Sequence, residues 1–302
     1  MHQLSHALNQ SGIDCTMAYF GTHNRVRFET DRMICEPAGD RASMAYYADY
    51  GPRVAHEIVL DRETLLVVPE AVPVPRGATA ACGVAIWWLS IDNAFPGKPE
   101  LRDQPQRAAF LQTPGLIHLY QSEYARQWLV EGGAEQVYAL SDYTARLFTE
   151  APAAAPAASA KASFNAQKGV VEAQEFFARR PGYDALALKG YTKLALRNIF
   201  AERALYVDFG HFPGKDRMPR EAAVSGSIVF VNRAGAGAFG EDFPLPDPFK
   251  FTSGEIGEAL DARLLAALAD PRRHWDMQAP FRAAILDERT RFFAEVRRLW
   301  GG

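Results

Sequence analysis

The sequence predicts an α/β protein made of two Rossmann-like, doubly wound domains. Apolar runs of strand length alternate with amphipathic helical stretches along most of the 302 residues, which is typical of parallel sheets covered by helices. The runs at 64–70 and 83–93 have continuous apolar stretches that end in polar residues, as in strands that are buried on both faces. A stretch rich in proline and alanine at 150–163 interrupts the alternation and indicates the joint between the two domains.

Composition excludes several classes of protein. A hydrophobic content of 48% with 23% charged residues excludes wholesale disorder. The net charge of -3 gives no support to a nucleic-acid partner. Three cysteines without a CxxC pair suit a reducing compartment and do not indicate a zinc site. No apolar run reaches the roughly 20 residues that span a bilayer, and the start lacks a secretory signal, so we expect a cytoplasmic protein.

The first half is expected to begin with a helix. Leu4, Ala7 and Leu8 have helical spacing, and Gly12 fits the end of that helix. A domain of this class normally starts with a strand and a glycine-rich turn before such a helix, and here both are missing. Either the true start lies upstream or the chain has lost them. Strands are predicted at 15–20, 64–70, 83–93, 115–122 and 136–144, and a helix at 123–132; a further short apolar run lies at 57–60.

The second half resumes the alternation. Strands are predicted to end at 165 and to cover 183–190, 204–210 and 227–232. Helices are predicted at 168–182, 192–202 and 219–226, and a long helix with one broad apolar face is predicted at 279–300.

A polar loop between the strand at 204–210 and the next helix has the composition of an anion site. Pro219 suits the first turn of that helix, so the positive end of the helix dipole points into the loop. Backbone N–H groups and basic side chains together favour a phosphate. Alternatively, Arg217 and Glu221, four residues apart, form an ion pair on the helix surface. The loop contains Gly210, His211, Gly214, Lys215, Arg217, Arg220 and Glu221.

This stretch resembles the donor-binding region of family-4-like glycosyltransferases with the GT-B architecture, in which two Rossmann-like domains face each other. The resemblance rests on the order Pro219, Glu221, Ala222, Ala223 and Gly226, followed by the apolar strand 228–230. It implies that Glu221 holds the donor ribose and that the helix start, with Gly214, lies near the diphosphate. The family commonly has a further glutamate where this chain has Pro213, and His211 and Lys215 are the nearest polar residues.

A second similarity to that family is found at 164–169, FNAQKG. Family members often have an aromatic-Asn-Pro-x-Lys-Gly stretch there, although Ala166 replaces the proline in this chain. The similarity implies that Lys168 reaches the diphosphate and that Asn165 shapes the turn; alternatively, the stretch is simply a loop and a helix start. Lys168, Lys215 and Arg217 would then neutralise the departing diphosphate. No carboxylate pair has metal-ligand spacing, so we expect neither a metal nor a cofactor besides the donor.

The first domain supplies the acceptor side in this interpretation. Asp92, at the end of a predicted strand, is the candidate base that deprotonates an acceptor hydroxyl, although it could equally cap a turn. Gln121 and Ser122 are candidate acceptor contacts, and His118 is expected to be a core histidine. Trp87 and Trp88 are neighbours on a strand and face opposite sides, so at least one is expected in the core.

We therefore expect a GT-B glycosyltransferase that moves a sugar from a nucleoside diphosphate sugar to a hydroxyl of a saccharide or lipid-linked acceptor, in bacterial surface polysaccharide synthesis. The predicted parts are an acceptor-side domain at 1–145, a linker or loop at 146–163, a donor domain at 164–274 and a helical segment at 275–302 that returns to the first domain. The arginine-rich side of that last helix could alternatively lie on the inner face of a membrane. A non-catalytic GT-B remnant that binds nucleotide or a full-length homologue is the second hypothesis.

Overall fold

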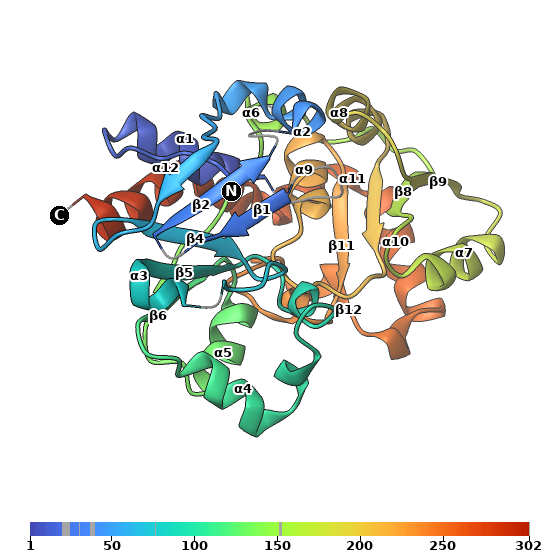
Figure 1. Ribbon diagram of the computed structural model, residues 1–302. Helices are drawn as coiled ribbons and strands as arrows, with labels where there is room; N and C mark the ends of the chain where they lie inside the picture. The colour runs from blue at the N-terminus through green and yellow to red at the C-terminus, as the bar shows by residue number, and fades with distance from the viewer. Residues whose placement is uncertain (20–24, 30, 37–39, 76, 151–152, 302) are drawn as a thin grey trace. The chain divides into compact units, whose positions relative to one another are not determined.

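A computed structural model of the chain, drawn in Figure 1, describes residues 1–19, 25–29, 31–36, 40–75, 77–150 and 153–301. The chain divides into two compact units. Unit 1 comprises Met1–Gln121, Arg126–Asp142 and Thr290–Gly302, and unit 2 comprises Ser122–Ala125 and Tyr143–Arg289. Each unit contains its own parallel sheet with helical connections, so the predicted mixed α/β class is confirmed.

The parallel sheet of unit 1 has the strand order β4-β5-β6-β7. All four strands coincide with predicted strands, and every residue from Val84 to Trp88 is buried. Helices α3 (Ala78–Ala81), α4 (Gln104–Leu111) and α5 (Glu123–Glu131) lie between them in the chain, as do the 3₁₀ turns η2 (Ile91–Ala94) and η3 (Pro99–Arg102). The strands are β4 (Leu65–Pro69), β5 (Gly83–Trp88), β6 (Leu116–Tyr120) and β7 (Val137–Ala139).

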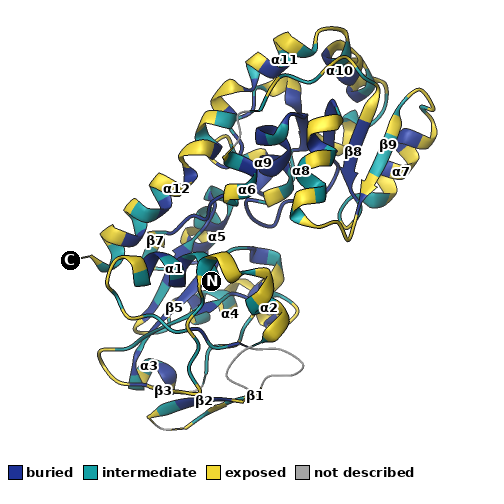
Figure 2. Ribbon diagram, turned by 90° about the horizontal axis from the view of Figure 1, so that it is seen from above, coloured by how far each residue is buried: buried dark blue, intermediate teal, exposed yellow. Residues whose placement is uncertain are grey.

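Unit 1 also contains an antiparallel sheet that the sequence analysis did not predict. It consists of β1 (Arg25–Phe28), β2 (Arg32–Glu36) and β3 (Glu57–Val59), in the order β1-β2-β3. Burial alternates along β2, where Met33 and Cys35 are buried and their neighbours in the strand are partly or fully exposed. Figure 2 accordingly shows this sheet in mixed burial colours, a pattern typical of a sheet that is covered on one face. The apolar run at 57–60 therefore belongs to this sheet.

The predicted first helix is present as α1 (His2–Gln10). It ends in a Schellman motif, in which Gly12 has φ +79° and the Ile13 N–H bonds to the Leu8 carbonyl at 3.0 Å. The strand predicted at 15–20 is wrong over its described residues, where Met17 makes one isolated bridge to Val54; Phe20 lies outside the described residues. The Asn9 side chain binds both backbone groups of Cys15, at 2.9 and 3.1 Å, and so takes the place of a neighbouring strand. The short helices α2 (Arg41–Tyr46) and η1 (Ala48–Tyr50) follow β2.

Unit 2 is built on a parallel sheet with the order β12-β11-β10-β8-β9. The strand that comes first in the chain, β8, lies between the second and the third, β9 and β10, so consecutive connections leave β8 and β10 in opposite directions. The carboxyl ends of β8 and β10 thus form the switch point at which open α/β sheets bind ligands. The strands are β8 (Lys161–Asn165), β9 (Asp184–Leu188), β10 (Leu205–Asp208), β11 (Ile228–Asn232) and β12 (Lys250–Phe251).

The helices of unit 2 confirm most predicted positions. Helix α9 begins at Arg217, two residues before its predicted start, and Pro219 lies in its first turn. Strand β12 and helices α10 and α11 were not predicted. Residues 153–160 of the predicted linker carry no helix or strand, and 151–152 lie outside the described residues. The helices are α6 (Arg146–Thr149), α7 (Val170–Ala178), α8 (Lys193–Glu202), α9 (Arg217–Ser225), α10 (Glu258–Ala269), α11 (Pro271–Met277) and α12 (Ala279–Trp300), with the 3₁₀ turns η4 (Ala236–Ala238), η5 (Asp247–Phe249) and η6 (Ser253–Glu255).

Phenylalanine and aliphatic side chains fill the core of unit 2. Phe164, Val207, Phe230 and Phe251 come from four of its strands, and each is at most 5% exposed. Within the described part of the chain, no helix is long and apolar enough to cross a membrane.

Candidate functional site

Two loops meet closely at the switch point of unit 2. One joins β8 to α7 and the other joins β10 to α9. Gly169 has φ +59°, and a Cβ there would lie 2.5 Å from the Phe209 carbonyl carbon. A Cβ on Gly210 would lie 2.6 Å from the Lys168 Cβ. The approach of the two loops therefore requires glycine at both positions.

Both loops lead into a helix N-terminus without a side-chain cap. Gly169 is the N-cap of α7 and Asp216 is the N-cap of α9, and neither residue provides a side-chain hydrogen bond to its own helix. The first N–H groups of each nine-residue helix have no partner within the helix, and the helix dipole makes them attractive to an anion. Two such ends at one switch point form a local arrangement that can bind phosphate groups.

An ion pair connects the two loops. Lys168 Nζ donates to Asp216 Oδ2 at 2.6 Å, with 34% of the Lys168 side chain and 24% of the Asp216 side chain exposed. Water can reach both groups, so the pair can open when a stronger anion approaches the lysine.

Asp208, at the end of β10, is a fully buried carboxyl group that the sequence analysis did not select. Its Oδ2 accepts from the Tyr206 hydroxyl at 2.6 Å, and its Oδ1 accepts from the Gly210 N–H at 3.0 Å. The Asp208 pKa is raised to about 6, chiefly by burial and also by the nearby Asp216 carboxylate, while the hydrogen bonds and Lys168 oppose the rise. Burial also raises the Tyr206 pKa, and the neighbouring carboxylates, including Glu221, act in the same direction.

Lys215 and Arg220 belong to a buried network centred on Glu288 of α12. Lys215 Nζ lies 3.2 Å from Glu288 Oε1, and Arg220 Nη1 donates to Glu288 Oε2 at 2.9 Å. The Thr144 N–H and hydroxyl donate to the same oxygen, Oε2, at 2.8 and 2.9 Å. Arg220 also donates to the carbonyl oxygens of Lys215 and Asp216, so it shapes the loop just before α9. Glu288 is thus a buried carboxylate partner that Lys215 and Arg220 share.

The other predicted donor residues occupy different surroundings in unit 2. Glu221 lies in the first half of α9 and is 5% exposed. Asn165 shapes the turn after β8, as predicted, because its Oδ1 accepts from the Gln167 N–H at 2.9 Å. His211 is exposed, with its ring 6.0 Å from that of Tyr124. Gly214 is buried, and Arg217 is the exposed first residue of α9.

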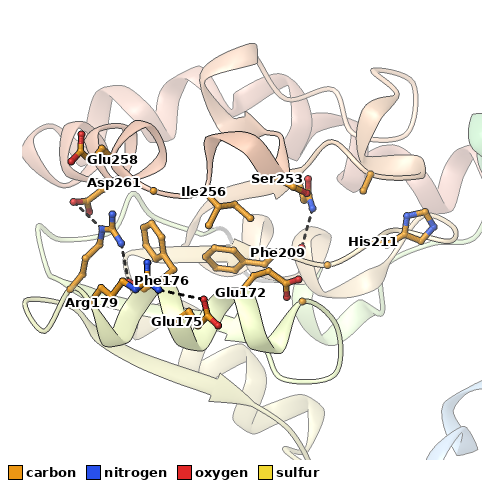
Figure 3. Close-up of a pocket in the computed structure, with 16 residues that line it drawn as sticks. Glu172, Glu175, Phe176, Arg179, Phe209, His211, Ser253, Ile256, Glu258 and Asp261 are labelled. Carbon is orange, nitrogen blue, oxygen red and sulfur yellow. Dashed lines mark hydrogen bonds and ion pairs between the residues drawn. The ribbon is translucent and has the colours of Figure 1, made fainter.

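A pocket of about 1020 Å³ opens beside the switch point. Figure 3 shows the residues of α7 on one side, those of α10 and the segment before it on the other, and Phe209 between them. His211 lies toward one end of the pocket, and Arg179 and Asp261 lie toward the other. The lining comprises Gly169, Glu172, Glu175, Phe176, Arg179, Arg180, Phe209, Gly210, His211, Asn232, Ala234, Ser253, Ile256, Gly257, Glu258 and Asp261.

The acceptor-side candidates lie just after strands of the parallel sheet in unit 1. Asp92 follows β5, and Gln121 and Ser122 lie between β6 and α5. Asp92 lies in η2, after β5, and is partly exposed. Gln121 follows β6 and is 9% exposed, and the Ser122 hydroxyl, which is counted with unit 2, accepts from the Ala125 N–H at 3.1 Å. Glu70, which follows β4, is 3% exposed, accepts from the Leu89 N–H, and has a pKa raised by burial.

Three aromatic residues of unit 1 have structural roles. Trp88 Nε1 donates to His118 Nδ1 at 3.1 Å, and His118 Nε2 lies 2.9 Å from the Leu111 carbonyl oxygen. Trp87 Nε1 donates to the Leu140 carbonyl at 2.8 Å. His118 is therefore a core histidine, as expected, and burial lowers its pKa. Both tryptophans are core residues, being at most 1% exposed, so neither offers a face to a sugar.

Sequence reasoning missed Asp208, Asp216 and Glu288 as members of the site. A signal for Glu288 existed, because it continues the apolar spacing of Phe281, Ile285 and Phe292 along α12. A carboxylate at such a position needs a buried cation, but the spacing cannot say which one. Among the described residues, no group of three or more His, Cys, Asp or Glu side chains could hold a metal ion.

Comparisons by sequence identify no relative, since neither a known protein family nor a curated protein matches the chain. Solved structures do match it. The crystal structure of TarM has a TM-score of 0.57 at 10% identity over 80% of this chain and 55% of its own. The pneumococcal O-GlcNAc transferase GtfA, in complex with UDP and GlcNAc, has a TM-score of 0.52 at 11% identity over 78% of this chain and 57% of its own.

The chain thus spans a little over half the length of these two structures. Their similarity concerns the fold, and it agrees with the two parallel sheets and with the switch point of unit 2. The chain has the GT-B glycosyltransferase fold.

Proposed function

We propose that the chain is a glycosyltransferase whose unit 2 binds a nucleoside diphosphate sugar at the carboxyl ends of β8 and β10. The observation that carries this proposal is the switch point itself, where two uncapped helix N-termini and the Lys168 ammonium converge. Few ligands match that arrangement as well as a diphosphate does. GtfA, which shares the fold, was solved with UDP and GlcNAc, and this supports the same class of ligand.

Lys168 and Arg217 are the cations that we assign to the diphosphate. Lys168 is held by a partly exposed carboxylate, and Arg217 is exposed at the first position of α9. Lys215 is paired with the buried Glu288, so its proposed contribution is to shape the loop rather than to contact a phosphate. In the transition state, positive charge near the leaving diphosphate stabilises the departing oxygen without a metal.

We assign the remaining predicted donor residues as follows. Glu221, on α9, would accept hydrogen bonds from the ribose hydroxyls. The loop backbone at Gly214 would lie close to the phosphates, while Asn165 keeps the β8 loop in its turn. His211, which lines the pocket beside the switch point, would contact the transferred sugar. A donor bound there would leave the sugar accessible to an acceptor hydroxyl.

For the acceptor, we propose a hydroxyl of a saccharide or lipid-linked saccharide in bacterial surface polysaccharide synthesis. Asp92 would act as the base and Gln121 and Ser122 as contacts, because all three follow strand ends of a parallel sheet. The buried Glu70 is a further carboxyl group at that edge, and its raised pKa suits proton transfer.

Release of nucleoside diphosphate from a panel of nucleotide sugars tests this function. We expect turnover by the full chain with at least one donor. Glu221→Ala should lower kcat/KM about tenfold or more while the protein stays folded, since two charge-assisted hydrogen bonds to the ribose are lost. Glu202→Ala, an exposed residue at the end of α8, is the matched control. Binding of the nucleotide without turnover of any donor would favour the non-catalytic alternative.

A further inference from the structure

Lys250 is a nearly buried lysine outside the site described above. It lies in β12, pairs in register with Val231, and is 3% exposed. Its Nζ donates to the Phe239 carbonyl oxygen at 3.0 Å. A lysine ammonium carries three N–H donors. Within the residues that the structure describes, the Phe239 carbonyl is the one acceptor found for them. The amine therefore has hydrogen-bonding capacity to spare.

The charges around Lys250 do not compensate its burial. Its pKa is lowered to about 8, first by burial and then by the positive charge of Arg233. Asp242, Asp247 and Glu241 act in the opposite direction, but they do not restore the ordinary value. An anion next to the ammonium would remove this imbalance.

Two arginines stand beside the lysine. Arg233 follows β11, and its Nη2 donates to Asp247 Oδ1 at 2.7 Å, although 91% of the Asp247 side chain is exposed. Arg263 of α10 donates from Nη1 to the Lys250 carbonyl at 2.9 Å and pairs with Glu255. Asp247 is thus a weakly held partner that can leave Arg233 at little cost.

These three basic residues line a hollow of about 340 Å³ in unit 2. We call it the basic pocket, and it is lined by Arg233, Asp247, Pro248, Lys250, Glu255 and Arg263. It shares no lining residue with the larger pocket of Figure 3, although Arg233 lies between Asn232 and Ala234, which line that larger pocket.

We propose that the basic pocket binds a phosphate group, either as inorganic phosphate or as a phosphate monoester. Three basic residues that lie far apart in the sequence line one hollow together with Asp247 and Glu255, and a tetrahedral dianion can accept from an ammonium and from a guanidinium at the same time. Arg233 would exchange Asp247 for the phosphate. Lys250 would donate to the phosphate with the N–H groups that do not bond to the Phe239 carbonyl. This site is distinct from the proposed donor site and does not depend on it.

Thermal shift and calorimetric titration test the proposal on the full chain. Inorganic phosphate and phenyl phosphate are titrated against chloride at constant ionic strength. We expect stabilisation by at least one of the two, and about tenfold weaker binding in Lys250→Met, since a charge-assisted hydrogen bond is lost. Arg233→Met, at a partly exposed position, gives the same loss without altering the buried strand. Arg272→Met, which changes an exposed pair on α11, is the control.

Lys168→Met separates this site from the donor site. Phosphate binding should survive Lys168→Met, even if the proposed donor site does not exist. The proposal is overturned if neither probe binds better than chloride, or if Lys250→Met and Arg233→Met bind like the unaltered chain. Loss of phosphate binding in Lys168→Met alone would assign the phosphate to the switch point and overturn it as well.

Discussion

At the scale of single residues, the switch point contains an anion of its own. The Asp216 carboxylate lies 2.6 Å from Lys168 Nζ. It therefore pairs with the same lysine that we assign to the diphosphate. Asp216 could instead cap α9, of which it is the N-cap residue, but its carboxylate makes no such bond. Binding of a diphosphate must therefore displace an internal competitor.

Asp216→Asn should consequently tighten the binding of a nucleoside diphosphate, by up to about fivefold, because a partly exposed ion pair contributes at most about 1 kcal/mol. The dissociation constant can be measured by calorimetry. In a Lys168→Met background the same substitution should have a smaller effect, since the competition no longer exists. Weaker binding by Asp216→Asn would instead show that Asp216 contacts the ligand.

Asp208 predicts a pH dependence of stability. Burial raises its pKa from 3.8 to about 6 in the folded chain, so between these values the unfolded chain loses its proton first. The contribution of Asp208 to stability is therefore greatest below pH 4 and is lost as the pH rises through about 6. Asp242 has a similarly raised pKa and acts over the same range.

In the Asp208→Asn variant, the loss of stability that Asp208 causes as the pH rises is absent. Relative to the unaltered chain, the variant should gain on the order of 3 kcal/mol between pH 4 and pH 7, following 1.36 kcal/mol per pKa unit. A constant offset from loss of a hydrogen bond does not affect this difference. Denaturant unfolding at several pH values measures it, and parallel pH profiles for the two proteins would refute the assigned role of Asp208.

At the scale of elements, the loop before α9 depends on α12. Glu288 is the counter-charge for both Lys215 and Arg220, and Arg220 in turn binds two carbonyl groups of the loop. Arg220 is 0% exposed and Glu288 is 2% exposed, so removal of the carboxylate takes a shared charged partner away from two cations in a poorly solvated place.

Glu288→Gln should therefore destabilise unit 2 by about 3 kcal/mol or more. It should also weaken nucleotide binding, because the loop loses its support. Asp287→Asn, the exposed neighbour on α12, should be close to neutral. Thermal unfolding of the two variants checks this, and equal melting temperatures would contradict the structural role of Glu288.

The sequence predicted elements better than it predicted their pairing. Buried parallel strands were recognisable because their apolar runs were continuous, as in Val84 to Trp88. The antiparallel sheet at 25–36 was missed, and residues 15–19 were predicted as a strand although Asn9 satisfies the Cys15 backbone. Such side-chain capping depends on tertiary proximity, which a local apolar pattern cannot reveal.

At the scale of the whole molecule, the GT-B fold could be predicted from the alternation of elements and from the loop around Glu221. The distribution of charge in the site could not be predicted. Of the basic residues in that loop, Lys215 and Arg220 turned out to be buried partners of Glu288, which lies 68 residues from Arg220 in the sequence. Asp208, which ends a strand, became visible as a site residue only once the strand order had placed β8 beside β10.

The central claim is that unit 2 binds a nucleoside diphosphate at its switch point. Calorimetric titration of the full chain with UDP, GDP and ADP tests it most directly, with Lys168→Met as the variant and Arg272→Met as the control. We predict binding of at least one of the three, about tenfold weaker in Lys168→Met and unchanged in Arg272→Met. Absence of binding by all three nucleotides, or equal affinity in Lys168→Met, would contradict the claim.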